Sequence, residues 1–289
     1  MQWLASYVMR GRRQALLVAV LSAGVPMFFW VSAAVLGLVT LRKGIAEGLL
    51  LLLWASLPAA AMVWLGEIVP LCTLVGVTLL AALLRATESW QLALLAATGL
   101  GLLLSIGLVV LGGSYIASIQ AIFAEFFAEL QRQAASQGVE FVSPDEVAIS
   151  GMFGLVLAVA LIMSLLIARW WQAMLYNPGG LQTEFHALRL QPLAVILLLL
   201  LTGLFAFVFE RMQFWIWIPM LPVFFAGLGL MHGLIARRGL GNQWLVLMYV
   251  GLVIMPVVKE GLMVLAVADS WIDFRHRLGN TEERQFNRY

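Results

Sequence analysis

The sequence predicts an all-α fold, a polytopic integral membrane bundle of helices that forms one domain over residues 1–289. Three observations support this fold class. The chain is 63% hydrophobic and only 11% charged, whereas an average soluble domain has about 25% charged residues. Its mean hydropathy is +0.98. Its apolar residues form about eight runs, and in hydrocarbon a helix is the structure that satisfies the backbone groups of such a run internally.

These runs divide the chain into four parts. The first four runs lie within residues 14–112 and the last four within 150–268, while 113–149 forms a polar insert and 269–289 a charged cytoplasmic tail. Each run is long enough, or nearly so, for a helix to cross roughly 30 Å of hydrocarbon. The runs cover residues 15–41, 48–66, 68–84, 90–111, 150–168, 192–209, 214–235 and 244–268.

Pairs of small residues four positions apart would let some of these helices approach closely. Such pairs include Ala33 with Gly37, and Gly229 with Gly233. Small residues at these spacings allow backbone-to-backbone contact in membrane bundles. Because the chain has 26 glycines, many pairs of this kind arise by chance.

The 113–149 insert contains a predicted amphipathic helix. Apolar residues from Ile116 to Leu130 recur at helical spacing, with glutamine and glutamate between them. This helix either packs against its own bundle or forms a lid or a partner-docking surface. After it, Ser143 is the expected N-cap of the fifth apolar helix, with Pro144 at its first position and Glu146 at its third, as in a capping box.

Lysine and arginine counts leave two orientations open. If all eight runs cross the membrane and the N-terminus is cytoplasmic, nine basic residues lie inside and seven outside, a weak bias under the positive-inside rule. If the first and last runs double back at Pro26 and Pro256 as re-entrant segments, the count becomes fourteen inside to two outside. A proline kink in a spanning helix is the simpler event. Both arrangements put both termini on the cytoplasmic side of a bacterial inner membrane.

Two adjacent charges, Lys259 and Glu260, lie in the last apolar run. A lysine near the bilayer centre costs roughly 2.5–3.5 kcal/mol, so it normally faces a protein partner or water. The two side chains point about 100° apart on a helix and need separate partners, for which Glu67 and Glu210 at run boundaries are candidates. We expect either a buried polar site for a solute or proton, or a helix end near Pro256 where the charges meet water.

Residue types that usually carry catalysis or metal binding show no functional spacing. Cys72 is the only cysteine, and the three histidines form no zinc motif. His232 is interpreted as an interfacial residue because nothing pairs with it in sequence. The chain has no hydrolase, metalloprotease or nucleotide-loop motif and no basic stripe that would bind nucleic acid. We therefore expect a protein that is not an enzyme and that carries no cofactor and no metal.

The end of the last run, Gly261 to Arg275, reads GLMVLAVADSWIDFR. This stretch resembles the C-terminal signature of the YybS-like family of predicted bacterial inner-membrane proteins, and the layout of the apolar runs resembles that family over the whole chain. That family is distantly similar to the substrate-binding (S) components of energy-coupling-factor vitamin transporters. The resemblance implies a subunit that binds a small molecule within a helical bundle and associates with an ATP-driven module. The chain departs from the usual six-helix S component in its eight runs and its 113–149 insert.

Charged residues around the tail are candidates for anchoring or partner binding. On a helix that continues out of the membrane, Asp273 and Arg277 stand at positions i and i+4 and form a favourable pair. Exposed pairs contribute only a few tenths of a kcal/mol, so these charges also suit a simple role in anchoring and capping the last helix. The candidates are Asp269, Asp273, Arg275 and Arg277.

Two functions are compatible with these patterns. The first is a small-solute-binding or transport-related membrane subunit without its own ATPase, motivated by the charges in the last run and by the resemblance. The alternative is a non-catalytic scaffold or assembly factor that holds a protein partner through helix 114–136 or the tail. The expected partners are the lipid bilayer and either a membrane protein or a small solute.

Overall fold

The computed structural model confirms the all-α membrane fold. It describes residues 1–275, apart from the side chain of Glu210, and all regular structure in this part of the chain is helical. Six of the described helices are long and apolar enough to cross a membrane, or up to eight if each of two bent helix pairs counts as one span. These pairs are Gly180–Ala187 with Pro192–Val208, bent by 71°, and Gln243–Ile254 with Pro256–Ile272, bent by 118°. The six are Pro26–Lys43, Ile45–Trp64, Ile68–Thr87, Trp90–Leu111, Glu146–Tyr176 and Arg211–Arg237.

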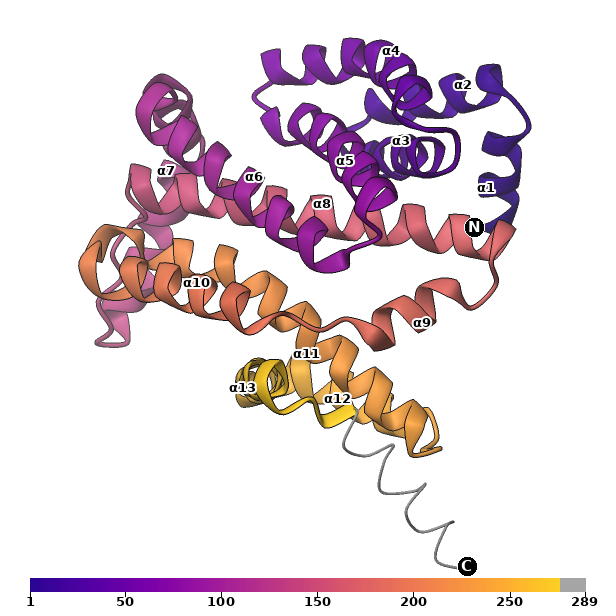
Figure 1. Cartoon of the computed structure of the whole chain (residues 1–289). Coiled ribbons are helices and arrows are strands. Elements are labelled where there is room, and N and C mark those ends of the chain that lie inside the picture. Colours follow the sequence, from indigo (N-terminus) through magenta and orange to yellow (C-terminus); the bar gives the residue numbers. More distant parts are fainter. Residues whose placement is uncertain (276–289) are drawn as a thin grey trace, which may run out of the picture.

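The N-terminal part of the chain is built around α3 (Phe29–Lys43), which packs against α2, α4, α5 and α8 (Figure 1). All residues of α3 from Val31 to Leu41 are buried. The other elements of this part are α1 (Gln2–Met9), α2 (Arg12–Ala23), η1 (Pro26–Phe28), α4 (Ile45–Trp64), α5 (Ile68–Thr87) and α6 (Trp90–Leu111).

The C-terminal part is joined to this bundle by α8 (Glu146–Tyr176), which packs against α3, α5 and α6 and also against α11. Figure 1 shows α9 to α13 on the far side of α8 from α2 to α5. The remaining elements are α7 (Gly113–Ser136), α9 (Gly180–Ala187), α10 (Pro192–Gly203), η2 (Leu204–Val208), η3 (Glu210–Ile216), α11 (Trp217–Arg237), α12 (Gln243–Ile254) and α13 (Pro256–Ile272).

Neither the first nor the last apolar run is one continuous helix, because each breaks at its central proline. Proline disfavours the helical conformation in the residue before it. Val25, before Pro26, is extended at φ −121°, ψ 116°, and Met255, before Pro256, is extended at φ −124°, ψ 104°. Pro58, by contrast, lies inside α4 without ending it.

The first pair, α2 and α3, folds back on itself. The Ser32 hydroxyl on α3 donates to the Ala19 carbonyl on α2 at 2.8 Å. At the outer ends of the pair, Arg12 Nε donates to Glu47 Oε2 at 2.9 Å, which joins the start of α2 to the start of α4. Since α4 follows α3 directly, both outer ends of the pair lie together.

The last pair, α12 and α13, forms a V with a bend of 118° at Met255. Arg237 Nη1, at the end of α11, donates to the Arg275 carbonyl just beyond α13 at 2.5 Å. Because α12 begins shortly after α11 ends, both outer ends of the V lie at the same end of α11. The two broken runs thus share the doubled-back geometry that the charge count favours.

The predicted amphipathic helix is confirmed as α7. Within α7 as the structure describes it, Ile116 is the only buried residue, and it packs with Leu108 of α6 and Ile149 of α8. Further along the helix, Ile122 is 72% exposed and Phe126 is 57% exposed. The first turns of α7 therefore pack against the bundle, while Ile122, Phe123 and Phe126 of its later apolar face are exposed within the described chain.

The expected capping box at the start of α8 is wrong by two residues. The helix begins at Glu146, and Asp145 is its N-cap, with Oδ1 accepting from the Ala148 N–H at 2.8 Å. Asp145 also accepts from Arg211 Nε at 2.8 Å. Burial raises the pKa of Asp145, but the Ala148 N–H and the Arg211 guanidinium outweigh it and hold the pKa below its usual value. This second partner favours Asp145 over Ser143 as the cap.

Candidate functional site

Lys259 and Glu260 lie in the first turns of α13 and face different surroundings. Lys259 is half-buried, and its Nζ lies 3.8 Å from the centroid of the Trp217 ring at the start of α11. Glu260 is exposed. Among the side chains that the structure describes, Lys259 forms no ion pair; its partner is the aromatic face, which attracts a cation through the ring quadrupole.

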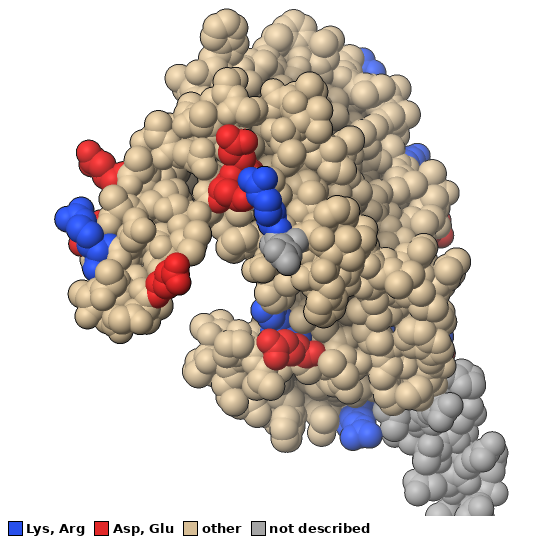
Figure 2. Space-filling model, turned by 90° about the vertical axis from the view of Figure 1, so that its left-hand side faces the viewer, with Lys and Arg blue, Asp and Glu red and all other residues tan. Residues whose placement is uncertain are grey.

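The two other residues of the expected intramembrane site lie on other elements. Glu67 is exposed at the N-cap of α5, beside Gly66, whose carbonyl accepts from the Tyr115 hydroxyl of α7 at 2.7 Å. Glu210 is the first residue of η3, and its side chain lies outside the described part. No hydrogen bond or ion pair joins the described side chains of Lys259, Glu260 and Glu67. On the face of the molecule that Figure 2 presents, the surface has a hollow with charged side chains on both of its rims.

The tail residues, in contrast, form a buried polar cluster at the end of α13. The helix ends at Ile272 because Asp273 adopts the left-handed conformation, with φ 51° and ψ 70°. Asp269 Oδ1 then accepts from the Phe274 N–H at 2.9 Å. The helix on which an Asp273–Arg277 pair was expected therefore ends at Ile272. Arg277 lies outside the described residues, so the pair itself stays a prediction.

Arg275 is the buried centre of this cluster. It is 5% exposed and Asp269 is 2% exposed, and Arg275 Nη1 lies 3.1 Å from Asp269 Oδ2. Arg275 Nη2 donates to the Leu188 carbonyl at 2.8 Å. Burial lowers the pKa of Arg275, while Asp269 and Asp273 raise it. A guanidinium stays charged in proteins, so the Asp269 carboxylate compensates a buried positive charge.

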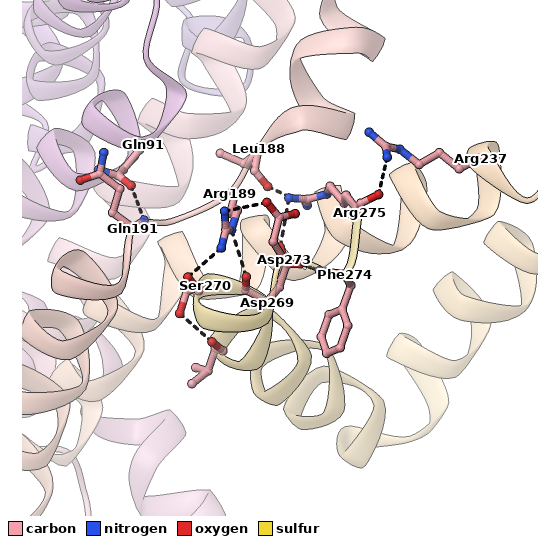
Figure 3. Close-up of polar contacts among 11 residues, drawn as sticks. Gln91, Leu188, Arg189, Gln191, Arg237, Asp269, Ser270, Asp273, Phe274 and Arg275 are labelled. Atoms are coloured by element: carbon pink, nitrogen blue, oxygen red, sulfur yellow. Dashed lines mark hydrogen bonds and ion pairs between the residues drawn. The ribbon is translucent and has the colours of Figure 1, made fainter. Parts of the chain in front are cut away.

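Arg189 ties a second segment to the same helix end (Figure 3). Its Nε donates to the Asp269 carbonyl at 3.0 Å and its Nη2 to the Ser270 carbonyl at 2.9 Å, while Nη1 donates to Asp273 Oδ2 at 2.9 Å. A cation at these carbonyls also complements the negative end of the helix dipole. We call Arg189, Asp269, Asp273 and Arg275 the tail lock, because they fasten the α9–α10 connection to the end of α13.

The short helix α9 is held on its other sides as well. Glu184 forms an ion pair with Arg169 of α8, with Nε 3.1 Å from Oε2. The same carboxylate accepts from Trp90 Nε1 of α6 at 2.9 Å. On α11, a Cβ at Gly229 would lie 2.6 Å from the Phe185 carbonyl oxygen, and one at Gly233 would lie 3.0 Å from that of His186. This small-residue pair thus lets the α9 backbone rest directly on α11.

A cavity of about 770 Å³ lies between α8, α9, α11 and α12. Its lining contains no lysine, arginine, aspartate or glutamate, and its polar side chains include His186, His232, Gln182 and Asn242. The two imidazole rings lie 6.2 Å apart between centroids, and His232 Nε2 lies 2.9 Å from the Tyr249 hydroxyl. We call this the histidine cavity. His232 is therefore not an isolated interfacial histidine, since the fold pairs it with His186 across 46 positions of sequence.

Sequence reasoning found three of the four tail-lock residues and missed Arg189. Arg189 lies 84 residues from Asp273, and a basic residue at a loop is indistinguishable in sequence from a membrane-flanking charge. His186 was missed for the same reason. Residues 269–289 hold as many basic as acidic residues, so no imbalance of charge in the sequence points to Arg189.

The histidine cavity has the composition of a binding site. Among the described residues, no group of three or more histidine, cysteine, aspartate or glutamate side chains could hold a metal ion. The cavity offers aromatic and aliphatic surface with a few hydrogen-bonding groups, which is the usual composition of a small-molecule site. Comparisons with protein-family models, with curated proteins and with solved structures found no match to this chain.

Proposed function

We propose that the protein is a small-solute-binding, transport-related membrane subunit without an ATPase of its own, and that the histidine cavity holds the solute. The observation that carries this proposal is an uncharged cavity of about 770 Å³ with two imidazoles in its wall. Its volume lies in the range of about 300–1,000 Å³ that small-molecule sites occupy. The sequence has no nucleotide-binding loop, so transport would draw its energy from a partner protein, as the resemblance to S components implies.

The lining selects the chemistry of the solute. A charged group buried against this wall would have no counter-charge among the lining residues, and an unpaired buried charge is costly. The solute is therefore uncharged, with an apolar or aromatic body that contacts Trp170 and Phe185 and with polar groups that bond to His186 or Gln182. The tail lock serves this site indirectly, because it fixes α9, one of the cavity walls.

Filling the cavity tests this proposal. Ala236 lines the cavity and is exposed, so Ala236→Trp places an indole in the solute's space. Ala187, also exposed but not part of the lining, provides the matched control Ala187→Trp. The protein is purified from native membranes in mild detergent, and its bound small molecules are extracted and identified by mass spectrometry.

We expect one compound to be enriched with the unmodified chain and with Ala187→Trp, and to be reduced at least about tenfold with Ala236→Trp, a loss of about 1.4 kcal/mol in affinity. Absence of any enriched compound, or equal enrichment in all three preparations, would overturn the proposal. Cross-linking in native membranes tests the transport part, and failure to capture any ATPase-containing partner counts against it.

We further propose a bacterial inner-membrane location with both termini in the cytoplasm and with the first and last pairs re-entrant. This topology is supported by three polar contacts between loops and helix ends that carry basic residues. Arg85 donates to the Leu41 carbonyl, Gln91 accepts from the Gln191 N–H, and Arg189 reaches the end of α13. These segments therefore lie at one end of the bundle, as the fourteen-to-two count requires.

Single cysteines test this topology after Cys72 is replaced. Cysteines at 45, 137 and 240 are treated in intact cells with a membrane-impermeant maleimide. The re-entrant arrangement predicts labelling at 137 alone. Labelling at 45 and 240 with protection of 137 is the result expected of eight simple crossings, and it would exclude the re-entrant arrangement.

A second candidate function, a non-catalytic scaffold or assembly factor, is favoured by α7. The exposed side chains of Phe123 and Phe126 suit a helix-in-groove contact with a protein partner. The double change Phe123→Ser/Phe126→Ser removes this face without touching the buried Ile116, and Gln133→Ser on the same helix is the control. Loss of a cross-linked partner in the double variant alone supports this function; unchanged cross-linking removes its basis.

A further inference from the structure

A second cavity, independent of the histidine cavity, opens between α5 and α6. It has a volume of about 690 Å³ and is lined by α5 and α6 together with parts of α4, α7 and α8. The lining includes Leu71, Val75, Leu103 and Gly107. We call this the α5–α6 groove. Its rim is open to the outside of the bundle, since Val75 is 40% exposed and Leu103 is 65% exposed.

Water is a poor occupant for this groove. At roughly 30 Å³ per molecule, the volume would take about 20 waters, each of which needs two to four polar partners. The only side chains of the lining with polar atoms are Cys72 and Tyr115, and the Tyr115 hydroxyl already donates to the Gly66 carbonyl. Both α5 and α6 are long and apolar enough to cross a membrane. The groove therefore faces hydrocarbon, and its occupant is apolar.

One end of the groove lies next to a charged residue, Glu67, which precedes the lining residue Ile68 in the chain. Ile68 and Tyr115 line this end, and Glu67 stands between Gly66 and Ile68 with an exposed side chain. The Tyr115 hydroxyl donates to the carbonyl of Gly66, the residue before Glu67, at 2.7 Å, so Glu67 and Tyr115 belong to the same end of the groove. Within the described residues, Glu67 forms no ion pair. An apolar slot that ends at an unpaired carboxylate complements an acyl chain whose headgroup carries a positive charge.

We propose that the α5–α6 groove binds an acyl chain of a phospholipid with an ammonium headgroup, of the phosphatidylethanolamine class, and that Glu67 receives the ammonium group. The site differs from the histidine cavity in location, charge and ligand, so its test does not depend on the solute.

The groove can be filled without disturbing the packing of the bundle. A Cβ at Gly107 would meet no atom within 4 Å, so Gly107→Leu projects into the groove. Gly99, on the same helix, is equally open but does not line the groove, and Gly99→Leu is the matched control. Glu67→Gln removes the charge at the mouth and leaves the apolar slot intact.

Each variant is reconstituted in nanodiscs of equimolar phosphatidylethanolamine and phosphatidylglycerol, and retained lipids are counted by native mass spectrometry. We expect the unmodified chain and Gly99→Leu to retain phosphatidylethanolamine in preference, by about fivefold. Gly107→Leu should lower retention at least about tenfold, and Glu67→Gln should abolish the preference between the two lipids. Equal retention by Gly107→Leu and the unmodified chain, or no preference in the unmodified chain, would overturn the proposal.

A measurement on the unmodified chain decides the matter if Gly107→Leu does not fold. Phosphatidylethanolamine with a diazirine in its acyl chain is photolysed in the nanodisc, and the cross-linked peptides are mapped. Cross-links concentrated in 68–76 and 100–112 support the proposal. An even distribution over the lipid-facing sides of α4, α5 and α6 contradicts it.

Discussion

The first and last helix pairs, α2–α3 and α12–α13, break at prolines in the same way but take different shapes. In α2, Ala15, Ala19 and Ala23 recur every four residues and are all buried, so α2 lies closely along α3. In α12, Met248 is the only buried residue, and the pair stays open at a bend of 118°. The proline determines where the chain turns, and the size of the facing side chains determines how far the pair closes.

The two pairs are also fastened at their outer ends by different means. At the outer end of the α2–α3 pair, Arg12 of α2 forms an ion pair with Glu47 of α4, and the arginine side chain is 62% exposed. The α12–α13 pair ends in the tail lock, whose Asp269 and Arg275 side chains are 3% and 6% exposed. The closely packed pair thus has only an exposed ion pair at its outer end, whereas the outer end of α13 in the open V carries a buried ion pair and is fastened to the α9–α10 connection.

Removing the buried carboxylate of Asp269 should have the largest effect on the free energy of unfolding. Asp269→Ala removes the ion-pair partner of the buried Arg275, and removing one partner of a buried pair costs about 3–5 kcal/mol. Asp273→Asn is the control, because the Asp273 side chain is 36% exposed and asparagine tolerates the left-handed backbone; it should cost about 1 kcal/mol or less. Equilibrium unfolding in mixed micelles measures both. Equal losses in the two variants would show that burial does not distinguish these carboxylates.

Enlarging one of the buried alanines of α2, which we call the alanine row (Ala15, Ala19 and Ala23), should have the next largest effect on the free energy of unfolding. Ala19→Leu forces a bulky side chain between α2 and α3, and overpacking of a close contact costs about 1–3 kcal/mol. Leu17 is 53% exposed on the same helix, so Leu17→Phe adds volume outward at little cost. The same unfolding assay compares the two variants. If Ala19→Leu is tolerated as well as Leu17→Phe, small residues are not what closes this pair.

Removing the proline of the open pair should change its shape more than its stability. Pro256→Ala frees Met255 to become helical, so straighter conformers gain population while the free energy of unfolding changes by about 1 kcal/mol or less. Spin labels at the exposed positions 246 and 264, in a chain without Cys72, report the opening as a longer and broader electron–electron distance distribution.

The same spin-label distance measurement on the α2–α3 pair provides the comparison. Pro26→Ala should leave the distance between labels at positions 17 and 42 unchanged, because the alanine row holds α2 on α3 without the proline. A lengthening of similar size in both pairs would mean that the prolines alone set the two shapes.

Removing the exposed ion pair should have the smallest effect. Glu47→Gln breaks the Arg12–Glu47 contact at the protein surface, where such pairs contribute little. The unfolding midpoint should fall less than in any variant above, and the difference should vanish near 1 M salt, where the Debye length is about 3 Å. If Glu47→Gln lowers the unfolding midpoint as much as Ala19→Leu does, the Arg12–Glu47 ion pair contributes substantially to the stability of the α2–α3 pair.

The sequence predicted the helices better than their contacts. The run 90–111 matches α6, and the amphipathic spacing predicted α7, because both depend on local periodicity. The tail-lock contact of Arg189 was beyond reach, since a charge pair over 84 positions has no local signature. Among the described side chains, Lys259 contacts the Trp217 ring, and nothing in the sequence singles out this residue among 11 tryptophans.

The contact of α9 with the glycine pair of α11 sets the mutational tolerance of these positions. Gly229 and Gly233 face carbonyl oxygens at 2.6 and 3.0 Å from a hypothetical Cβ, while Gly99 and Gly107 face open space. In a saturation library, Gly229 would accept glycine alone and Gly233 would accept at most small side chains, whereas Gly99 and Gly107 would accept a broad range. Four glycines that look alike in the sequence thus carry opposite information, because two mark a backbone-to-backbone contact and two mark a surface open to lipid.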